Sequence, residues 1–263
     1  MRCSKRKIIV AKTMTKTLLF IDSSIKIGHN HNARIEQYKN GFKSVSKHME
    51  FFRSNNIDLL WVDNTISSLD EIGALRECID LDNVKTVFKK NNKYGKLNKG
   101  AGCIEHWILG TDIWRHYDYI IHFEARQVLI NVSFFEEFLR EPISMFSWAY
   151  RKPSAPLGIL TKRDRRFRLD LYGPNVPKNT HRQNPNAVRH FNDFYTGLFS
   201  VSVPEFIELV NNIRLDGMVK HRVFLEKIMM SFAYCRLDKF KMVDKLYVWR
   251  GGDRNDSNSV KQS

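Results

Sequence analysis

Four short apolar segments recur along the first half of this 263-residue chain, and their alternation with helix-like stretches constrains the fold more than any other feature. Each segment is five to nine residues long, the length of a buried strand, and has polar residues on both sides. Strands that alternate with helices build βαβ units. We therefore predict an α/β fold in which helices flank a mostly parallel sheet. The segments are "TLLFID" (17–22), "IDLLWVD" (57–63), "VKTVF" (84–88) and "YDYIIHFEA" (117–125).

Apolar residues at helical spacing fill much of the sequence between these strands. From residue 33 to residue 55 they recur at steps of three and four, with charged residues between them, which predicts an amphipathic helix. Further helices are predicted at about 69–78, 103–115, 133–140, 203–214 and 219–236, and further strands at 143–150 and 245–250.

No repeat and no clean linker divides the chain, so we predict a single domain over residues 17–250. A basic segment, 1–16, precedes it, and a polar tail, 251–263, is expected to be flexible. Residues 151–190 have weak periodicity, and a loop of this length is typically functional or mobile. Its basic part, 151–173, suits a lid over a phosphorylated ligand, a contact with an anionic acceptor or membrane, or a solvated loop.

The chain carries 43 Lys and Arg against 28 Asp and Glu, a formal net charge of +15. Such an excess favours a polyanionic partner, a phosphorylated ligand or an anionic surface, although solvated lysines give the same total. Nucleic-acid binding is therefore an alternative function. No helix-turn-helix, zinc-finger or RNP signature supports it, and the aromatic residues have the spacing of core positions.

The four cysteines, Cys3, Cys78, Cys103 and Cys235, show neither a CxxC pair nor the Cys/His spacing of a zinc site. Scattered cysteines are typical of reduced thiols. No apolar run approaches the roughly 18 residues of a membrane span, and "LLFI" near the N-terminus is too short for a signal-peptide core. We therefore expect a cytoplasmic protein that has no structural zinc site and contacts membranes at most peripherally.

Polar and acidic residues follow directly on several of the predicted strands. Ligands of parallel sheets bind outside the carboxyl ends of the strands. Asp22 ends the first strand, Asp63 and Asn64 end the second, and Glu124 and Arg126 follow the fourth. Asp63 can accept a hydrogen bond from a ribose or a base, or it can cap an Asx turn. Glu124 can hold Mg²⁺ or Mn²⁺ through its oxygens, or it can form an ion pair with Arg126.

The stretch "NKGAG" (98–102) places two glycines before a predicted helix and after a lysine-rich loop. Glycines let the backbone approach a ligand closely, and a helix that begins after them offers free N–H groups to a phosphate. No acidic residue occurs between Val84 and Cys103. A diphosphate ligand explains both features, and a plain strand-to-helix turn with solvated lysines is the simpler alternative. The pattern matches neither the dinucleotide-binding fingerprint nor the P-loop.

Together, "VDN" (62–64), "NKGAG" and "YDYIIHFEA" resemble, in their order and spacing, the nucleotide-sugar half of the GT-A-type glycosyltransferases. The resemblance covers roughly residues 17–202. More narrowly, the layout looks like the small glycosyltransferases of large algal (chlorella) viruses and their bacterial surface-polysaccharide relatives. The resemblance implies a GT-A-like, Rossmann-like domain with a nucleotide-sugar half at 17–126 and an acceptor half at 127–250. For a viral source, it also implies a location in the host cytoplasm or the virion.

This resemblance assigns roles to individual residues. Asp63 matches the acid that binds the nucleoside, and Glu124 falls on the first acid of the metal motif. Arg126 stands in the place of the second acid, so either Glu124 and the diphosphate hold the metal or Arg126 itself supplies the positive charge. The full set of candidate donor-binding residues is Asp22, Asp63, Asn64, Asn98, Lys99, Gly100 and Arg126.

The acceptor side is expected in "HFNDFYTGLFSV" (190–201), where Thr196 and Gly197 match a Thr-Gly pair near the sugar. Asp193, beside this pair, is the candidate catalytic base for the acceptor hydroxyl, or else a loop-capping residue. Glu226 is the second candidate base, or else a solvated residue on a helix surface.

The implied function is transfer of a hexosyl or pentosyl group from a nucleoside-diphosphate sugar to a glycan or glycoprotein acceptor. Mn²⁺ or Mg²⁺ would neutralise the leaving diphosphate. Two alternatives stay open: a basic nucleic-acid-binding protein, and a GT-A-like scaffold that has lost its activity, which Arg126 would explain. His122 lies within an apolar strand and is expected to be a core histidine rather than a ligand.

Overall fold

The computed structural model describes residues 15–27, 31–79, 81–148, 194–234, 239–243 and 247–250. The predictions for residues 151–190, for the candidate base Asp193 and for the C-terminal tail lie outside the described residues.

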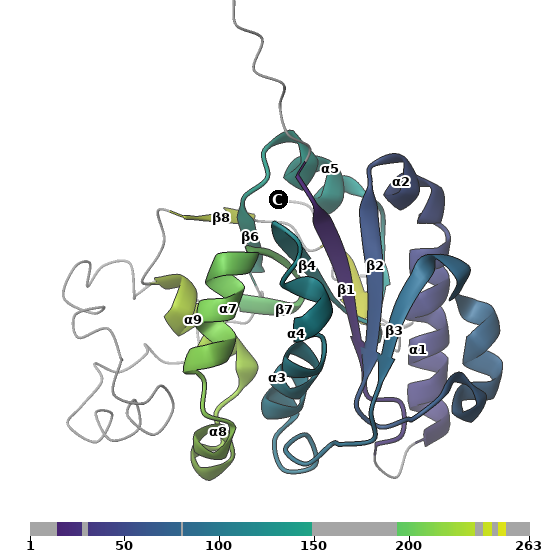
Figure 1. The fold of residues 1–263 in the computed structure, drawn as a ribbon, viewed down its shortest axis with the longest axis horizontal. Coiled ribbons are helices and arrows are strands. Elements are labelled where there is room, and N and C mark those ends of the chain that lie inside the picture. The colour runs from purple at the N-terminus through teal and green to yellow at the C-terminus, as the bar shows by residue number, and fades with distance from the viewer. Residues whose placement is uncertain are drawn as a thin grey trace, which may run out of the picture.

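Seven strands form one sheet in the order β3-β2-β1-β4-β7-β6-β8 (Figure 1). β1 pairs in parallel with β2 and β4, β2 with β3, and β6 with β8, whereas β7 is antiparallel to both of its neighbours. All strands of this sheet except β7 therefore run in one direction, which confirms the predicted α/β fold with a mostly parallel sheet. The strands are β1 (Thr17–Ser23), β2 (Ile57–Asp63), β3 (Val84–Phe88), β4 (Tyr119–Glu124), β6 (Ser144–Trp148), β7 (Phe194–Ser202) and β8 (Phe240–Val243).

Helices cover both faces of this sheet, so the domain has three layers (Figure 1). One face packs against α1 (His31–Ser46), α2 (Met49–Ser54), the 3₁₀ helix η1 (Leu69–Cys78) and α5 (Ser133–Arg140). The other face packs against α3 (Lys99–Leu109), α4 (Thr111–Trp114), α7 (Val203–Asn212), α8 (Leu215–His221) and α9 (Leu225–Tyr234). A short 3₁₀ turn, η2 (Leu81–Asn83), precedes β3, and β5 (Gln127–Leu129) pairs with β9 (Val248–Arg250) in a small separate sheet.

The central strand β1 explains why both faces have to be covered. Leu19 and Ile21 belong to one hydrophobic core, Leu18 and Phe20 to the other, and all four are fully buried. Successive side chains of a strand point to opposite faces, so a continuous apolar run is stable only when helices bury it from both sides.

Several predicted boundaries differ from the observed ones. The helix predicted over 33–55 is divided by a turn into α1 and α2, although the apolar spacing continues through the turn. The helix predicted over 219–236 is also two helices, because Arg222 takes a left-handed conformation (φ 51°) that ends α8. β5, β7 and β8 were not predicted as strands.

The strands that run parallel to β1 all end at one edge of the sheet, the lower edge in Figure 1, which we call the carboxyl edge. β7 begins at this edge because it runs the other way: Phe123 in β4 pairs with Leu198 in β7, so residues 194–197 lie level with the end of β4 and beyond it. β6 ends there too, with Trp148 paired to Phe194. No helix among the described residues has the length and apolar character that crossing a membrane requires.

Candidate active site

The carboxylate of Asp63, at the end of β2, organises two loops at the carboxyl edge. It is fully buried and accepts hydrogen bonds of 2.5–3.2 Å from the hydroxyls of Ser23 and Thr65 and from the backbone N–H groups of Ile25, Thr65 and Ile66. Part of this pattern is the Asx turn considered as the alternative for this residue. A nucleoside-binding role for Asp63 stays a prediction, and it requires a ligand to displace protein donors.

Asn64 continues this network and is also fully buried. Its Oδ1 accepts a hydrogen bond from the Ser24 hydroxyl at 2.9 Å, and its Nδ2 lies 3.4 Å from Asn92 Oδ1 and 3.5 Å from the carbonyl oxygen of Gly102. The Asn64 amide thus links the end of β1, the loop after β3 and the first turn of α3.

The stretch 98–102 is the beginning of α3, so this helix starts earlier than predicted. Asn98 is its N-cap, with Oδ1 accepting a hydrogen bond from the N–H of Ala101 at 3.1 Å. Its Nδ2 donates to the carbonyl oxygens of Met218 at 3.1 Å and Val223 at 2.9 Å. The Asn98 side chain therefore ties α3 to the connection between α8 and α9.

The two glycines of this stretch are required by close packing within the protein. A Cβ at Gly100 would lie 2.8 Å from the backbone nitrogen of Leu225, and a Cβ at Gly102 would lie 2.6 Å from the Cα of Gly95. Both distances are shorter than real Cβ contacts. Protein atoms fill the space on the Cβ side of both glycines, which accounts for the glycines without a ligand, and their role in donor binding stays a prediction.

The lysines near this loop are only partly available to a ligand. Lys99 is the first residue of α3 and is exposed. Lys26 and Lys90 both contact the Glu71 carboxylate, at 2.6 and 3.4 Å. Lys85 makes its hydrogen bonds near the start of β3, at the opposite end from the carboxyl edge.

Glu124, at the end of β4, is held by two donors. Its Oε1 forms an ion pair with Nη2 of Arg126, and its Oε2 accepts a hydrogen bond from Nε2 of Gln127 at 3.2 Å. The side chains of Arg126 and Glu124 are 30% and 26% exposed, so the pair borders solvent. Burial lowers the pKa of Arg126, but the Glu124 carboxylate outweighs this and shifts that pKa upward. Arg126 is therefore a permanent cation at the carboxyl edge.

The surroundings of Glu124 do not fit Mg²⁺ or Mn²⁺ as they stand. These ions prefer several oxygen ligands, whereas both Glu124 oxygens face nitrogen donors and the neighbouring side chain, Arg126, is a cation. Among the described residues, the group with metal-ligand spacing is a different one, Asp22, Cys103 and His122.

A second guanidinium, that of Arg34 on α1, lies near the same end of β1. Its Nη2 donates to the carbonyl oxygen of Ser24 at 3.1 Å and to the hydroxyl of Tyr38 at 3.3 Å, and this hydroxyl also accepts from the N–H of Ser24 at 2.9 Å. Burial raises the pKa of Tyr38 to about 12, against the opposing effect of Arg34 and Arg126. The carboxyl edge thus holds a neutral phenol near two guanidinium groups.

The start of β7 carries the predicted acceptor-side residues to this edge. The hydroxyl of Tyr195 donates to Oε1 of Gln127 at 2.5 Å, and its ring covers Gly197, where a Cβ would lie 2.7 Å from the ring. Thr196 Oγ1 lies 3.5 Å from Oε1 of Glu226, in the first turn of α9. Thr196 and Gly197 therefore lie at the carboxyl edge, with Glu226 beside Thr196, and their acceptor-side role stays a prediction.

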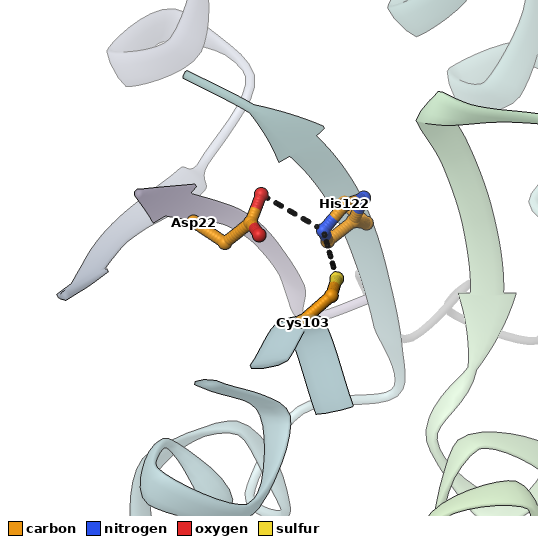
Figure 2. A group of neighbouring side chains, drawn as sticks. All are labelled: Asp22, Cys103 and His122. Carbon is orange, nitrogen blue, oxygen red and sulfur yellow. Dashed lines mark hydrogen bonds and ion pairs between the residues drawn. The ribbon is translucent and has the colours of Figure 1, made fainter. Parts of the chain in front are cut away.

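Three side chains from separate elements meet close to the carboxyl edge. Figure 2 shows Asp22 of β1, His122 of β4 and Cys103 of α3 pointing toward one another. His122 Nε2 lies 3.1 Å from Asp22 Oδ1 and 3.7 Å from Cys103 Sγ. The other carboxylate oxygen, Oδ2, lies 3.3 Å from Nδ1 of His106, whose Nε2 is 3.2 Å from the Ser24 hydroxyl.

The charges around this cluster shift two of its pKa values in opposite directions. Burial raises the pKa of Asp22, but the two neighbouring imidazoles outweigh burial and hold it well below its usual value. Burial raises the pKa of the Cys103 thiol, and the carboxylates of Asp22, Glu124 and Glu226 raise it further.

Sequence reasoning missed Cys103 and His106 as members of the site. Cys103 and His106 are three residues apart, so they lie on one face of the helix α3. This spacing in the sequence was the signal that could have identified them. His122 is buried and stacks between Phe20 and Phe199, as expected of a core histidine, yet its Nε2 points into the cluster.

The structure thus gathers Asp22, Glu124, Arg126, Thr196 and Gly197 at or beside the carboxyl edge. Asp63 and Asn64 lie at the same edge, but their side chains already form hydrogen bonds within the protein. Asn98 and Gly100 pack toward α8 and α9.

No protein-family model matches the chain, and no curated protein matches its sequence. Its structure is similar to that of core-mannan synthase A from Aspergillus fumigatus in a Mn/GDP form (TM-score 0.48, 10% identity, covering 88% of this chain and 73% of that one). It is also similar to a protein of Desulfovibrio desulfuricans G20 assigned as a nucleotide-diphospho-sugar transferase (TM-score 0.49, 8% identity, 94% and 90%). A third similar structure is mouse xyloside xylosyltransferase 1 in its apo form (TM-score 0.45, 10% identity, 87% and 85%).

A mostly parallel seven-stranded sheet with helices on both faces is consistent with the GT-A-like, Rossmann-like fold expected from the sequence. All three TM-scores are below 0.5, so the activity of this chain has to be inferred from its own side chains.

Proposed function

We propose that this protein is a glycosyltransferase that moves a hexosyl or pentosyl group from a nucleoside-diphosphate sugar to a glycan or glycoprotein acceptor. The observation that carries the proposal is that a partly exposed cation, Arg126, and a separate carboxylate, Glu226, are both gathered at the carboxyl edge. Direct displacement at an anomeric carbon by an inverting enzyme uses both charges: a cation for the leaving diphosphate and a base for the attacking hydroxyl.

On the donor side we assign the diphosphate to Arg126. A guanidinium can bind phosphate oxygens through two parallel N–H donors, and Nη2 of Arg126 now contacts one carboxylate oxygen of Glu124. A diphosphate would compete with Glu124 for these donors. Lys99 adds an exposed charge at the N-terminus of α3, the positive end of that helix.

On the acceptor side we assign the base to Glu226. Its position in the first turn of α9, beside Thr196, supports this role. The carboxylate would take the proton of the acceptor hydroxyl while the oxygen attacks the anomeric carbon, and the diphosphate would leave with the bonding electron pair. Asp193, the base expected from the sequence, remains the other candidate.

The charge of the leaving group is met by arginine in this proposal. Mn²⁺ or Mg²⁺ at Glu124 would first have to separate Glu124 from Arg126 and Gln127. We therefore expect nucleotide binding to persist when EDTA removes divalent ions.

The first test measures thermal unfolding with UDP, GDP and their parent nucleosides, each with Mn²⁺ and with EDTA. A ligand at a hundred times its dissociation constant stabilises the folded state by about 2.7 kcal/mol. We expect one diphosphate to raise the melting temperature, its nucleoside to have little effect, and Arg126→Gln to remove the shift. Arg115→Gln, which removes an exposed arginine that is also paired with an acid, should keep it. No shift with any diphosphate, together with a salt-sensitive shift with DNA or RNA, would favour the nucleic-acid alternative.

The second test measures sugar transfer. Loss of a general base lowers kcat by about 10²–10⁴-fold, so Glu226→Gln should lose activity and keep the diphosphate-induced stabilisation. Glu136→Gln, an exposed acid on α5, is the control and should keep both. A Glu226→Gln enzyme with full activity would transfer the assignment to Asp193.

A further inference from the structure

We infer that this chain binds one divalent ion of the zinc class between the Asp22 carboxylate, the Cys103 thiolate and the His122 imidazole. This ion site does not depend on the proposed function. It uses none of the side chains that we assign to the diphosphate or to the acceptor.

Two of the three separations between the ligand atoms fit a tetrahedral ion. Zinc lies about 2.3 Å from sulfur and about 2.0–2.2 Å from nitrogen or oxygen, which places nitrogen and sulfur ligands about 3.6 Å apart and nitrogen and oxygen ligands about 3.3 Å apart. The observed distances from His122 Nε2 are 3.7 Å to Cys103 Sγ and 3.1 Å to Asp22 Oδ1. All three ligand atoms lie within 4.8 Å of one another.

The carboxylate of Asp22 supplies an independent sign of a ligand. Its Oδ1 is buried and has no hydrogen-bond partner in the part of the chain that the structure describes, although His122 Nε2 is only 3.1 Å away. Two polar atoms that are this close can both face one shared ion. Oδ2 lies 3.3 Å from a further imidazole, His106, which is a neighbour that would orient the carboxylate.

The ligand positions are rigid before any ion binds. The ring of His122 stacks between Phe20 and Phe199, with centroid distances of 6.2 and 4.7 Å, and this stacking fixes the direction of Nε2. Asp22 and Cys103 come from β1 and α3 (Figure 2). An ion would therefore crosslink three elements that are distant in the sequence.

The kind of ligands selects the kind of ion. Thiolate and imidazole favour the zinc class, whereas Mg²⁺ and Mn²⁺ favour oxygen ligands. Binding replaces the S–H bond of Cys103 with a sulfur–metal bond, releases the proton to the buffer and changes no oxidation state. The Nδ1 atom of His122 is buried and lacks a hydrogen-bond partner among the described residues. A hydrogen-bond partner on the other nitrogen of a ligating histidine raises metal affinity by about 10–100-fold. Because His122 lacks one among the described residues, a chelator should remove this ion without denaturant.

The experiment uses the full-length chain, stripped with EDTA and titrated with Zn²⁺ or Co²⁺. We expect one zinc per chain by mass spectrometry of the metal, and a thiolate-to-cobalt charge-transfer band in the near ultraviolet. Cys103→Ser should lose both. Cys78→Ser removes a buried thiol that lies outside the cluster, so this variant should keep both.

A measurement on the unmutated chain decides the matter even if Cys103→Ser fails to fold. Alkylation of each cysteine is followed by peptide mass spectrometry with Zn²⁺, with Mg²⁺ and with EDTA. We expect Zn²⁺, but not Mg²⁺, to slow alkylation of Cys103 at least tenfold and to leave Cys78 unaffected. Equal alkylation of Cys103 under all three conditions, or a cobalt band that survives in Cys103→Ser, overturns the inference.

Discussion

Replacing Gly41 with alanine should force α1 away from the turn that carries the candidate site. A Cβ at Gly41 would lie 1.9 Å from the carbonyl oxygen of Ala125 and 2.7 Å from that of Gln127. Ordinary contacts begin at 3.4 Å, so the helix or the turn has to move by about 1.5 Å. Both obstructing atoms are backbone and cannot rotate away. We therefore take the upper end of the overpacking cost, about 3 kcal/mol, of which the helix propensity of alanine offsets about 1 kcal/mol.

The expected net loss is thus about 2 kcal/mol in the free energy of unfolding. Urea denaturation should show it as a lower midpoint with an unchanged slope. The same displacement reaches Arg126, between the two carbonyls, and a misplacement of about 1 Å can lower catalysis about 100-fold. Lys43→Ala, at an exposed position of the same helix, is the control and should stay within about 0.5 kcal/mol of the unmutated protein. A Gly41→Ala protein as stable as the original would refute this packing.

Three further predictions concern residues around the carboxyl edge. Asn98→Ala should lower the free energy of unfolding in urea by about 3 kcal/mol, because it removes an N-cap and two hydrogen bonds to backbone carbonyls. Asn98→Asp keeps the cap and should cost less. The pKa of the Tyr38 phenol is near 10 in the unfolded chain and about 12 in the folded protein. The contribution of Tyr38 to the free energy of unfolding is therefore complete below pH 10. It declines by up to about 2.7 kcal/mol between pH 10 and 12. Tyr38→Phe should lack this decline, and parallel alkaline unfolding curves for the two proteins would contradict the assignment. Asp63→Asn should destabilise the fold by at least about 3 kcal/mol, because its amide N–H₂ group would face N–H and O–H donors. An unchanged melting temperature in calorimetry would contradict this prediction.

The first half of the fold was predictable because β1, β2 and β4 are continuous apolar runs that are almost fully buried, so that local sequence alone reveals them. β7 and β8 differ in this respect. β7 contains Gly197 and several hydroxyl residues and is stabilised by pairing with both β4 and β6, while β8 has only four residues and pairs with a strand far away in the sequence. Such strands are determined by their partners more than by their own propensity.

The site was predictable in position but not in detail. The rule that ligands bind at the carboxyl ends of parallel strands located Glu124, Arg126 and Asp22 correctly at one edge. The engagement of Asp63 and the packing of Gly100 depend on residues from other segments, and nothing beside them in the sequence reveals those contacts. The zinc-class cluster was missed for the same reason, since its ligands are scattered along the chain while zinc motifs are recognised by short spacings.

The pairing of Trp148 with Phe194 has a consequence for how such a chain can change over evolution. β6 ends at Trp148 and β7 begins at Phe194, so the two strands on either side of residues 149–193 are paired directly with each other. Doubling the length of a flexible insertion costs only about 0.6 kcal/mol in closure entropy. Segments of different length and composition could therefore be exchanged between these two strands with the seven-stranded framework intact. Under the proposed function, such exchanges would let acceptor preference change while the remaining strands are inherited unchanged.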